Sequence, residues 1–138
     1  MRWVFADTLY WIASILPGDP WHGPALRAAA ALSKETPILT TQEVLIEVLS
    51  ACAGRGEFLR QSAATTVRRI LDNVHVTVLP QSSQSFLSGL ELYEHRQDKG
   101  YSLVDCISMN AMRENNITDI LTNDHHFGQE GFNVLIHK

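Results

Sequence analysis

Short runs of apolar residues alternate with longer segments of helical periodicity along the whole chain. This alternation predicts parallel βαβ units with right-handed crossovers, which place helices against a parallel sheet. The runs are too short and too apolar for an antiparallel sheet that is buried on one face only. We therefore predict an α/β fold in which a central parallel sheet of four to five short strands is flanked by helices. Strands are expected at residues 4–6, 38–40, 74–79, 120–122 and 133–136.

Helical segments fill the intervals between these runs. The turn at residues 17–20 ends the first helix, and the third helix begins at the capping residue Thr41 and stops before Gly54 and Gly56. The sequence contains no Gly-rich phosphate-binding loop. The remaining helices are expected at 8–16, 21–34, 58–71, 83–96 and 103–114.

The chain has 138 residues, for which a single domain over residues 1–138 is the expectation. Its hydrophobic content of 45% and charged content of 19% are typical of a globular protein. No apolar run approaches the roughly 20 residues that a membrane-spanning helix needs, and the N-terminal apolar stretch is too short for a signal peptide. We therefore predict a cytoplasmic protein without a membrane partner.

The formal net charge of −4 argues against a protein that coats nucleic acid non-specifically, since such proteins carry a broad basic surface. A small RNA site remains compatible with this charge. Four arginines fall within fifteen positions: Arg55, Arg60, Arg68 and Arg69. They form either a solvated helix face or a surface that contacts phosphates or a protein partner.

The two cysteines, Cys52 and Cys106, lie inside apolar helical patterns, which predicts buried, reduced thiols. Neither has metal-ligand spacing to another cysteine or histidine. Trp3, Trp11 and Trp21 are expected in the core or at a dimer interface rather than as platforms for nucleobases.

Four acidic residues fall where a predicted strand has just ended or a helix has just begun. Asp7 closes the first strand, Glu47 lies in the second turn of the third helix, Asp105 in the first turn of the helix at 103–114, and Asp124 follows the fourth strand. In a parallel α/β sheet these places share the edge at which such folds bind ligands. Two unit charges at 4 Å repel by about 1 kcal/mol in water and about 4 kcal/mol at a dielectric constant near 20. A hard divalent cation, Mg²⁺ or Mn²⁺, would most simply relieve that repulsion.

Each acid also has a purely structural interpretation. Asp7 and Asp124 are good helix N-caps, and Glu47 shares a helix face with Glu43 as a surface glutamate does. Asp105 follows Ser102 in a capping-box pattern, although its helix is apolar around most of its circumference. A buried carboxylate there needs a partner, and no basic residue is close in sequence.

The chain resembles PIN-domain ribonucleases, particularly the VapC-like toxins of bacterial type II toxin–antitoxin systems. The resemblance covers nearly the whole chain. The residues that carry it are Ala6-Asp7-Thr8, Leu45-Ile46-Glu47-Val48-Leu49, Tyr101-Ser102-Leu103-Val104-Asp105-Cys106, and Leu121-Thr122-Asn123-Asp124-His125-His126-Phe127 followed by Gly131-Phe132.

This resemblance implies a single PIN-like domain that hydrolyses RNA phosphodiester bonds with Mg²⁺ or Mn²⁺, an antitoxin protein as partner, and a homodimer. It implies that four acids are catalytic and bind one or two metal ions, with Thr8 and Thr122 as supporting polar residues. One departure is His125, where the family usually carries an arginine before the His-Phe pair. The implied catalytic and metal-binding residues are Asp7, Glu47, Asp105 and Asp124.

Two other classes of protein remain as alternatives: another Mg²⁺-dependent α/β domain, either a phosphatase or a receiver domain, and a non-catalytic binding module. A Mg²⁺-dependent phosphatase of the haloacid-dehalogenase type needs a second aspartate two residues after the first, where this chain has Leu9. A receiver domain needs paired acids near the first strand and a late lysine, where this chain has Arg2, Trp3 and only the terminal Lys138. A non-catalytic module that binds RNA or protein would fit the same fold, but the presence of all four acids argues against it.

Overall fold

The computed structural model describes residues 2–138, and they form a five-stranded parallel sheet in the order β3-β2-β1-β4-β5. The predicted parallel α/β fold is therefore confirmed. β1 lies at the centre because two crossovers lead in opposite directions from it, which makes the sheet edge beside β1 and β4 a ligand-binding position. The strands are β1 (Val4–Ala6), β2 (Ile38–Thr41), β3 (Val76–Leu79), β4 (Asp119–Leu121) and β5 (Asn133–Val134).

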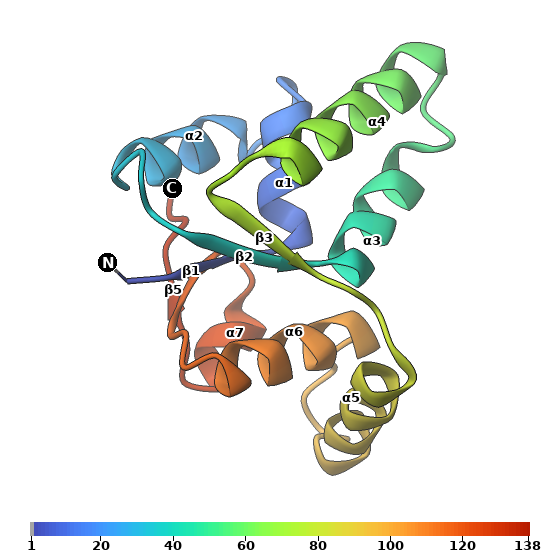
Figure 1. Cartoon of the computed structure of the whole chain (residues 1–138), viewed down its shortest axis with the longest axis vertical. Helices are drawn as coiled ribbons and strands as arrows, with labels where there is room; N and C mark the ends of the chain where they lie inside the picture. Colours follow the sequence, from blue (N-terminus) through green and yellow to red (C-terminus); the bar gives the residue numbers. More distant parts are fainter. Residues whose placement is uncertain (1) are drawn as a thin grey trace.

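Helices cover both faces of the sheet. Figure 1 shows α1 to α4 on one face and α5 to α7 on the other, as right-handed crossovers in both directions require. Every helix within residues 2–138 is too short or too polar to cross a lipid bilayer. The helices are α1 (Thr8–Ile15), α2 (His22–Ala30), α3 (Gln42–Cys52), α4 (Glu57–Asp72), α5 (Ser83–His95), α6 (Leu103–Glu114) and α7 (His125–Gln129).

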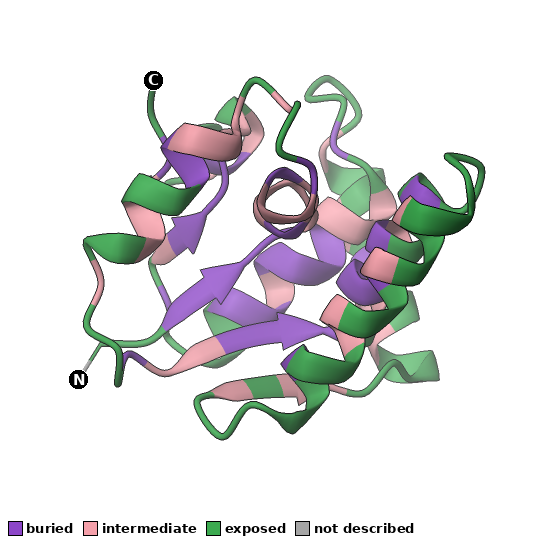
Figure 2. Ribbon diagram, turned by 90° about the horizontal axis from the view of Figure 1, so that it is seen from above, coloured by how far each residue is buried: buried purple, intermediate pink, exposed green. Residues whose placement is uncertain are grey.

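The core lies between the middle of the sheet and the helices on both faces. Figure 2 shows buried central strands and helices whose outer faces are exposed. Phe5 and Phe127 are fully buried, and Met109 and Met112 line the inner face of α6. Both cysteines are buried and unpaired, as predicted. Trp11 belongs to the core as expected, whereas Trp3 is exposed and Trp21 is half-buried.

Several boundaries differ from the sequence-based expectation. The second helix ends at Ala30 rather than at residue 34. In the turn that follows it, the Ser33 hydroxyl accepts a hydrogen bond from the Glu35 N–H. β3 begins at Val76 because the Asn73 side chain accepts a hydrogen bond from the His75 N–H at 2.8 Å, which holds a turn before the strand. β4 has its predicted length but lies one residue earlier, β5 ends at Val134 rather than at residue 136, and the short helix α7 follows β4.

Glu130, just after α7, ties the C-terminal part of the chain to α5 and α6. Its carboxylate accepts hydrogen bonds from Arg96 Nε at 2.6 Å, Arg113 Nη2 at 2.5 Å and Tyr101 Oη at 3.0 Å. Burial alone would raise the pKa of Glu130, but the hydrogen bonds from these three partners outweigh it and lower the pKa to about 2. The carboxylate is therefore ionised at any pH at which the protein is studied.

Replacing Glu130 by glutamine is expected to destabilise the fold by roughly 2–3 kcal/mol, since it removes one partner of a desolvated ion pair while both arginines keep some contact with water. Urea unfolding at neutral pH measures the change. The exposed Glu94 provides the control, and Glu94→Gln should leave the midpoint unchanged. Equal midpoints for the two variants would show that the Glu130 cluster does not hold α7 in place.

Candidate active site

The structure brings all four candidate acids together around one cavity at the carboxyl end of the sheet. The cavity has a volume of about 440 Å³. No lysine or arginine of residues 2–138 lines it. Its lining consists of the acids Asp7, Glu47, Asp105 and Asp124, the polar Thr8 and Ser102, and Leu9, Ile12, Asp19 and Trp21.

Asp7 is the most deeply buried of these acids, with an exposed fraction of 5%. It occupies the N-cap position of α1, but its side chain forms no capping hydrogen bond, so the capping interpretation does not explain it. Instead its Oδ2 accepts a hydrogen bond from Thr122 Oγ1 at 3.0 Å. Burial, and next the charge of Asp105, raise the pKa of Asp7 to about 7, against smaller opposing effects of the Thr8 amide and the Thr122 hydroxyl.

Thr122 links two of the acids. Its hydroxyl donates to Asp7 and accepts from the Asp124 N–H at 3.2 Å. Because β1 and β4 are neighbours in register, with Ala6 opposite Leu121, the residues that follow each strand lie side by side. The strand pairing therefore sets the spacing of Asp7 and Asp124.

Glu47 reaches the cavity from the second turn of α3. Its Oε1 accepts a hydrogen bond from Thr8 Oγ1 at 2.6 Å, and no described residue binds its Oε2. Burial raises the pKa of Glu47, the Thr8 hydrogen bond partly opposes this, and the charge of Asp105 adds to the rise. Glu43, one turn earlier, points elsewhere, because its Oε2 accepts a hydrogen bond from Ser85 of α5.

Asp105 and Asp124 each combine a capping role with a place in the cavity. Asp105 Oδ2 accepts from the Ser102 N–H while Ser102 Oγ accepts from the Asp105 N–H, both at 3.0 Å, which completes the predicted capping box of α6. Asp124 Oδ1 accepts from the His126 N–H at 2.9 Å at the start of α7. Burial is the main cause that raises the pKa of Asp105, and the neighbouring Asp124 charge adds to it.

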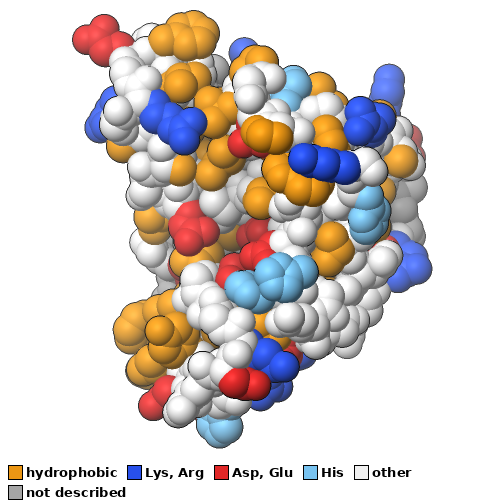
Figure 3. All heavy atoms as spheres, turned by 180° about the vertical axis from the view of Figure 1, so that it is seen from behind, with side chains coloured by type: hydrophobic (Ala, Val, Ile, Leu, Met, Phe, Trp, Pro, Cys, Tyr) orange, Lys and Arg blue, Asp and Glu red, His pale blue; other side chains and the backbone are white. Residues whose placement is uncertain are grey.

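The raised pKa values of Asp7, Glu47 and Asp105 share a physical origin. Each carboxylate is desolvated, and each feels the charge of another acid in the same cavity. Figure 3 shows acidic side chains gathered in a hollow near the centre of one face, with histidine side chains beside them. No lysine or arginine in the described lining compensates these charges, although the charge of His126 partly opposes the rise in the pKa of Asp105. The oxygen donors of the cluster are those that Mg²⁺ and Mn²⁺ prefer.

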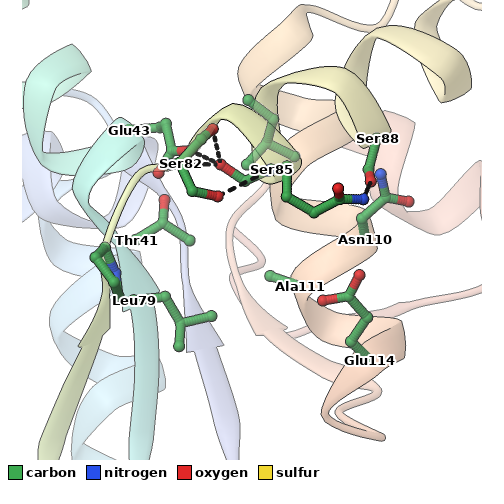
Figure 4. A pocket seen from close by; sticks show the side chains of 12 residues that line it. Thr41, Glu43, Leu79, Ser82, Ser85, Ser88, Asn110, Ala111 and Glu114 are labelled. Carbon is green, nitrogen blue, oxygen red and sulfur yellow. Dashed lines mark hydrogen bonds between the residues drawn. The ribbon is translucent and has the colours of Figure 1, made fainter.

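A second cavity, of about 190 Å³, lies between the end of β3, α5 and α6. Figure 4 shows Glu43, Ser82 and Ser85 on one side of it and Asn110 and Glu114 on the other. At the start of α5, Ser82 and Ser85 form a capping box, and Ser85 also donates a hydrogen bond to Glu43. The lining holds two acids, Glu43 and Glu114, where the acidic cavity described above has the four candidate acids.

Sequence reasoning missed three residues beside the acids. Asp19 and Trp21 line the cavity, and Asp19 Oδ1 accepts a hydrogen bond from the Trp21 N–H at 2.8 Å. His126 Nδ1 lies 3.4 Å from Asp124 Oδ1 and 3.9 Å from Asp105 Oδ2. The available signal for His126 was its place in the Leu121–Phe127 stretch that carries the family resemblance. All four arginines of the 55–69 stretch are exposed, and none of them lines this cavity.

Comparison with known proteins gives consistent matches over most of the chain. A model of the PIN domain matches residues 4–132. The 23S rRNA-specific endonuclease VapC20 of Mycobacterium tuberculosis is 30% identical over 132 residues, which cover 94% of this chain and 95% of that protein. The same protein from a second strain of that organism gives the same values.

Solved structures with a similar fold belong to the same group of proteins. The crystal structure of Mycobacterium tuberculosis VapC20, described as a Sarcin-Ricin loop cleaving toxin, has a TM-score of 0.83 and 26% identity, covering 94% of this chain and 95% of that chain. The structure of VapBC2 from Rickettsia felis, bound to a DNA fragment from its promoter, has a TM-score of 0.68 at 15% identity and covers 96% of both chains, which is a likeness of fold.

Proposed function

Because this chain belongs to the PIN-domain family and to its VapC-like ribonucleases, we propose that it cuts a loop of 23S ribosomal RNA with Asp7, Glu47, Asp105, Asp124 and a divalent cation. One observation carries this proposal: four carboxylates line a single cavity without a lysine or arginine among them. Desolvated acids that repel each other destabilise a fold, so their grouping favours a cation site over a structural role.

Asp7, Asp105 and Asp124 would hold Mg²⁺ or Mn²⁺, since they surround the cavity with oxygen donors. A cation held there lowers the pKa of bound water and relieves charge on phosphate oxygens. Thr122 fixes Asp7 relative to Asp124 by bonding to both. Glu47, held by Thr8 through Oε1, keeps Oε2 available either for the cation or for orienting the attacking water.

The substrate class follows from the relatives. VapC20 is named for 23S rRNA and for the Sarcin-Ricin loop. A single-stranded loop suits this site because an unpaired base can stack on an aromatic side chain, whereas an A-form duplex hides its base edges. Trp21 would supply such an aromatic ring beside the acids. Lys138 Nζ, 5.0 Å from the centroid of that ring, would add a positive charge for phosphate.

The remaining properties come from the same group of proteins. Residues 1–138 would act as one PIN-like nuclease domain, and its natural counterpart would be an antitoxin protein, as the VapBC pairing of a structural relative suggests. We expect a homodimer and a cytoplasmic location, where ribosomal RNA is accessible.

The proposal is tested by incubating the purified protein with an RNA hairpin that contains the Sarcin-Ricin loop. Cleavage is expected with Mn²⁺ or Mg²⁺, but not with chelator and not with Asp105→Asn. Asp72→Asn, on the exposed end of α4, is the matched control and should cleave like the wild type. Binding of the hairpin without cleavage in every condition would favour the non-catalytic module instead.

Millimolar Mg²⁺ or Mn²⁺ should raise the melting temperature of the protein, because a ligand that binds only the folded state stabilises it by about 2.7 kcal/mol at 100 times its Kd. Differential scanning fluorimetry with and without chelator measures this shift. Asp72→Asn should shift like the wild type and Asp105→Asn should shift less. The absence of any shift would count against a cation site in the isolated chain.

Thr8→Val should lower the cleavage rate by about 10- to 100-fold, the loss typical when a partner that orients a ligand is removed, because Glu47 loses the hydroxyl that holds it. Valine has nearly the same shape, so the melting temperature should change little. The exposed Thr65 of α4 gives the control variant Thr65→Val. An unchanged rate would remove Thr8 from the supporting residues.

A further inference from the structure

Asp124, His125 and His126 bring three potential ligand atoms together where β4 leads into α7. One carboxylate oxygen and one nitrogen from each imidazole all lie within 4.8 Å of one another. This group borders the acidic cavity and shares only Asp124 with its four acids. Its chemistry differs, since two of its three donors are imidazole nitrogens.

The distances from the two imidazoles to Asp124 can be compared with the ligand spacing around a bound ion. His126 Nδ1 lies 3.4 Å and His125 Nδ1 lies 3.8 Å from Asp124 Oδ1. Two ligands bonded to a tetrahedral ion at about 2.0–2.1 Å are about 3.3 Å apart. His126 Nδ1 is therefore already near the spacing that a shared ion requires, and His125 Nδ1 is somewhat farther from Asp124 Oδ1.

One ring nitrogen of His126 lacks a hydrogen-bond partner among the described residues. This Nδ1 atom is buried, although buried polar atoms in folded proteins are nearly always paired. The ring is held in place by Tyr101, which packs edge-on against it at 5.2 Å between centroids and is itself anchored to Glu130. The imidazole is thus fixed with an unused nitrogen toward Asp124.

His125 leaves the group open to solvent. Its side chain is 75% exposed, so an ion has a route of entry and water can complete its coordination. Asp105 Oδ2 lies 3.9 Å from the same His126 Nδ1 and adds negative charge without belonging to the three ligands.

We propose that Asp124, His125 and His126 form a second cation site that binds a first-row transition ion, such as Co²⁺, Ni²⁺ or Zn²⁺, through two imidazole nitrogens and one carboxylate. Imidazole suits these ions, whereas Mg²⁺ prefers oxygen donors and is expected in the neighbouring cavity. The site shares Asp124 with the proposed catalytic acids, but its test measures ion binding alone and does not depend on RNA cleavage.

The experiment titrates Co²⁺ into the Asp7→Asn protein, in which the oxygen-lined cavity is weakened, and follows heat and the visible spectrum of Co²⁺. Removing both imidazoles, as His125→Ala/His126→Ala, should weaken Co²⁺ binding by about tenfold or more, since loss of even an indirect partner costs 10- to 100-fold. The control His75→Ala/His95→Ala removes two histidines that are exposed and lie outside the group. It should bind Co²⁺ like the Asp7→Asn protein.

The single variant His125→Ala distinguishes loss of the ion site from loss of folding, because this exposed side chain is not part of the core. It too should weaken Co²⁺ binding, with an unchanged melting temperature in chelator. Unchanged Co²⁺ affinity in the double variant, or an equal loss in the His75/His95 control, would overturn the proposal. Failure of RNA cleavage with normal Co²⁺ binding would overturn the proposed function and leave this site standing.

Discussion

Replacing Asp7 by asparagine is expected to abolish RNA cleavage and yet to leave the metal-free fold as stable as the wild type or more stable. Cleavage should fall by at least about 10²–10³-fold, the loss typical when one group that stabilises developing charge is removed. Stability should not fall, because the carboxylate is buried, forms no capping hydrogen bond and lies among other acids. Asparagine keeps an oxygen that can accept the Thr122 hydrogen bond.

The two halves of this result distinguish a cation ligand from a structural residue. RNA cleavage and melting in chelator at neutral pH are measured on the same preparation, with Asp72→Asn as the exposed control. A fall of several degrees in the melting temperature of Asp7→Asn would identify Asp7 as a structural cap. Cleavage at the wild-type rate would remove it from the catalytic residues.

The second large effect is a loss of stability as the pH rises in the absence of metal. The pKa of Asp7 is raised from 3.8 to about 7 in the folded protein, so folding favours its protonated form. Above pH 4 the unfolded chain loses this proton while the folded protein keeps it until about pH 7. Stability should therefore fall through this interval by up to about 4 kcal/mol, at 1.36 kcal/mol per pKa unit.

Glu47 and Asp105 act in the same direction, since burial raises the pKa of both. Urea unfolding in chelator at constant ionic strength, from pH 5 to pH 8, measures the decline. Asp7→Asn should show a flatter profile, and saturating Mn²⁺ should restore stability at the upper end of the range. A wild-type profile that is flat or rises with pH would show that the acids are compensated within the protein itself.

The parallel fold and the grouping of the acids could be predicted because they follow from local patterns. Apolar runs separated by helical segments imply parallel strands, and this alone puts the residues after β1 and β4 on one edge of the sheet. The capping box at Ser102 could also be read directly, since it depends on four consecutive residues. These features could be predicted because each depends on residues that are close together in the sequence.

The other site residues depend on long-range packing that leaves no periodic signal. Asp19 and Trp21 reach the cavity because the turn after α1 folds back over it. α7 has only five residues, too few for a helical pattern, and it forms because Asp124 caps it and Phe127 is buried beneath it. The position of His126 beside Asp105 joins segments that are twenty-one residues apart in the sequence.

The double role of Asp105 and Asp124 as helix caps has a consequence for ion selectivity. Both carboxylates are immobilised by backbone N–H groups before any ion arrives, so little rotational freedom remains to be lost on binding. Rigid ligands also cannot move apart to suit a larger ion. Ca²⁺, whose bonds to oxygen are about 0.3–0.5 Å longer than those of Mg²⁺, should therefore bind more weakly, and a Ca²⁺ titration would reveal how stiff this edge of the sheet is.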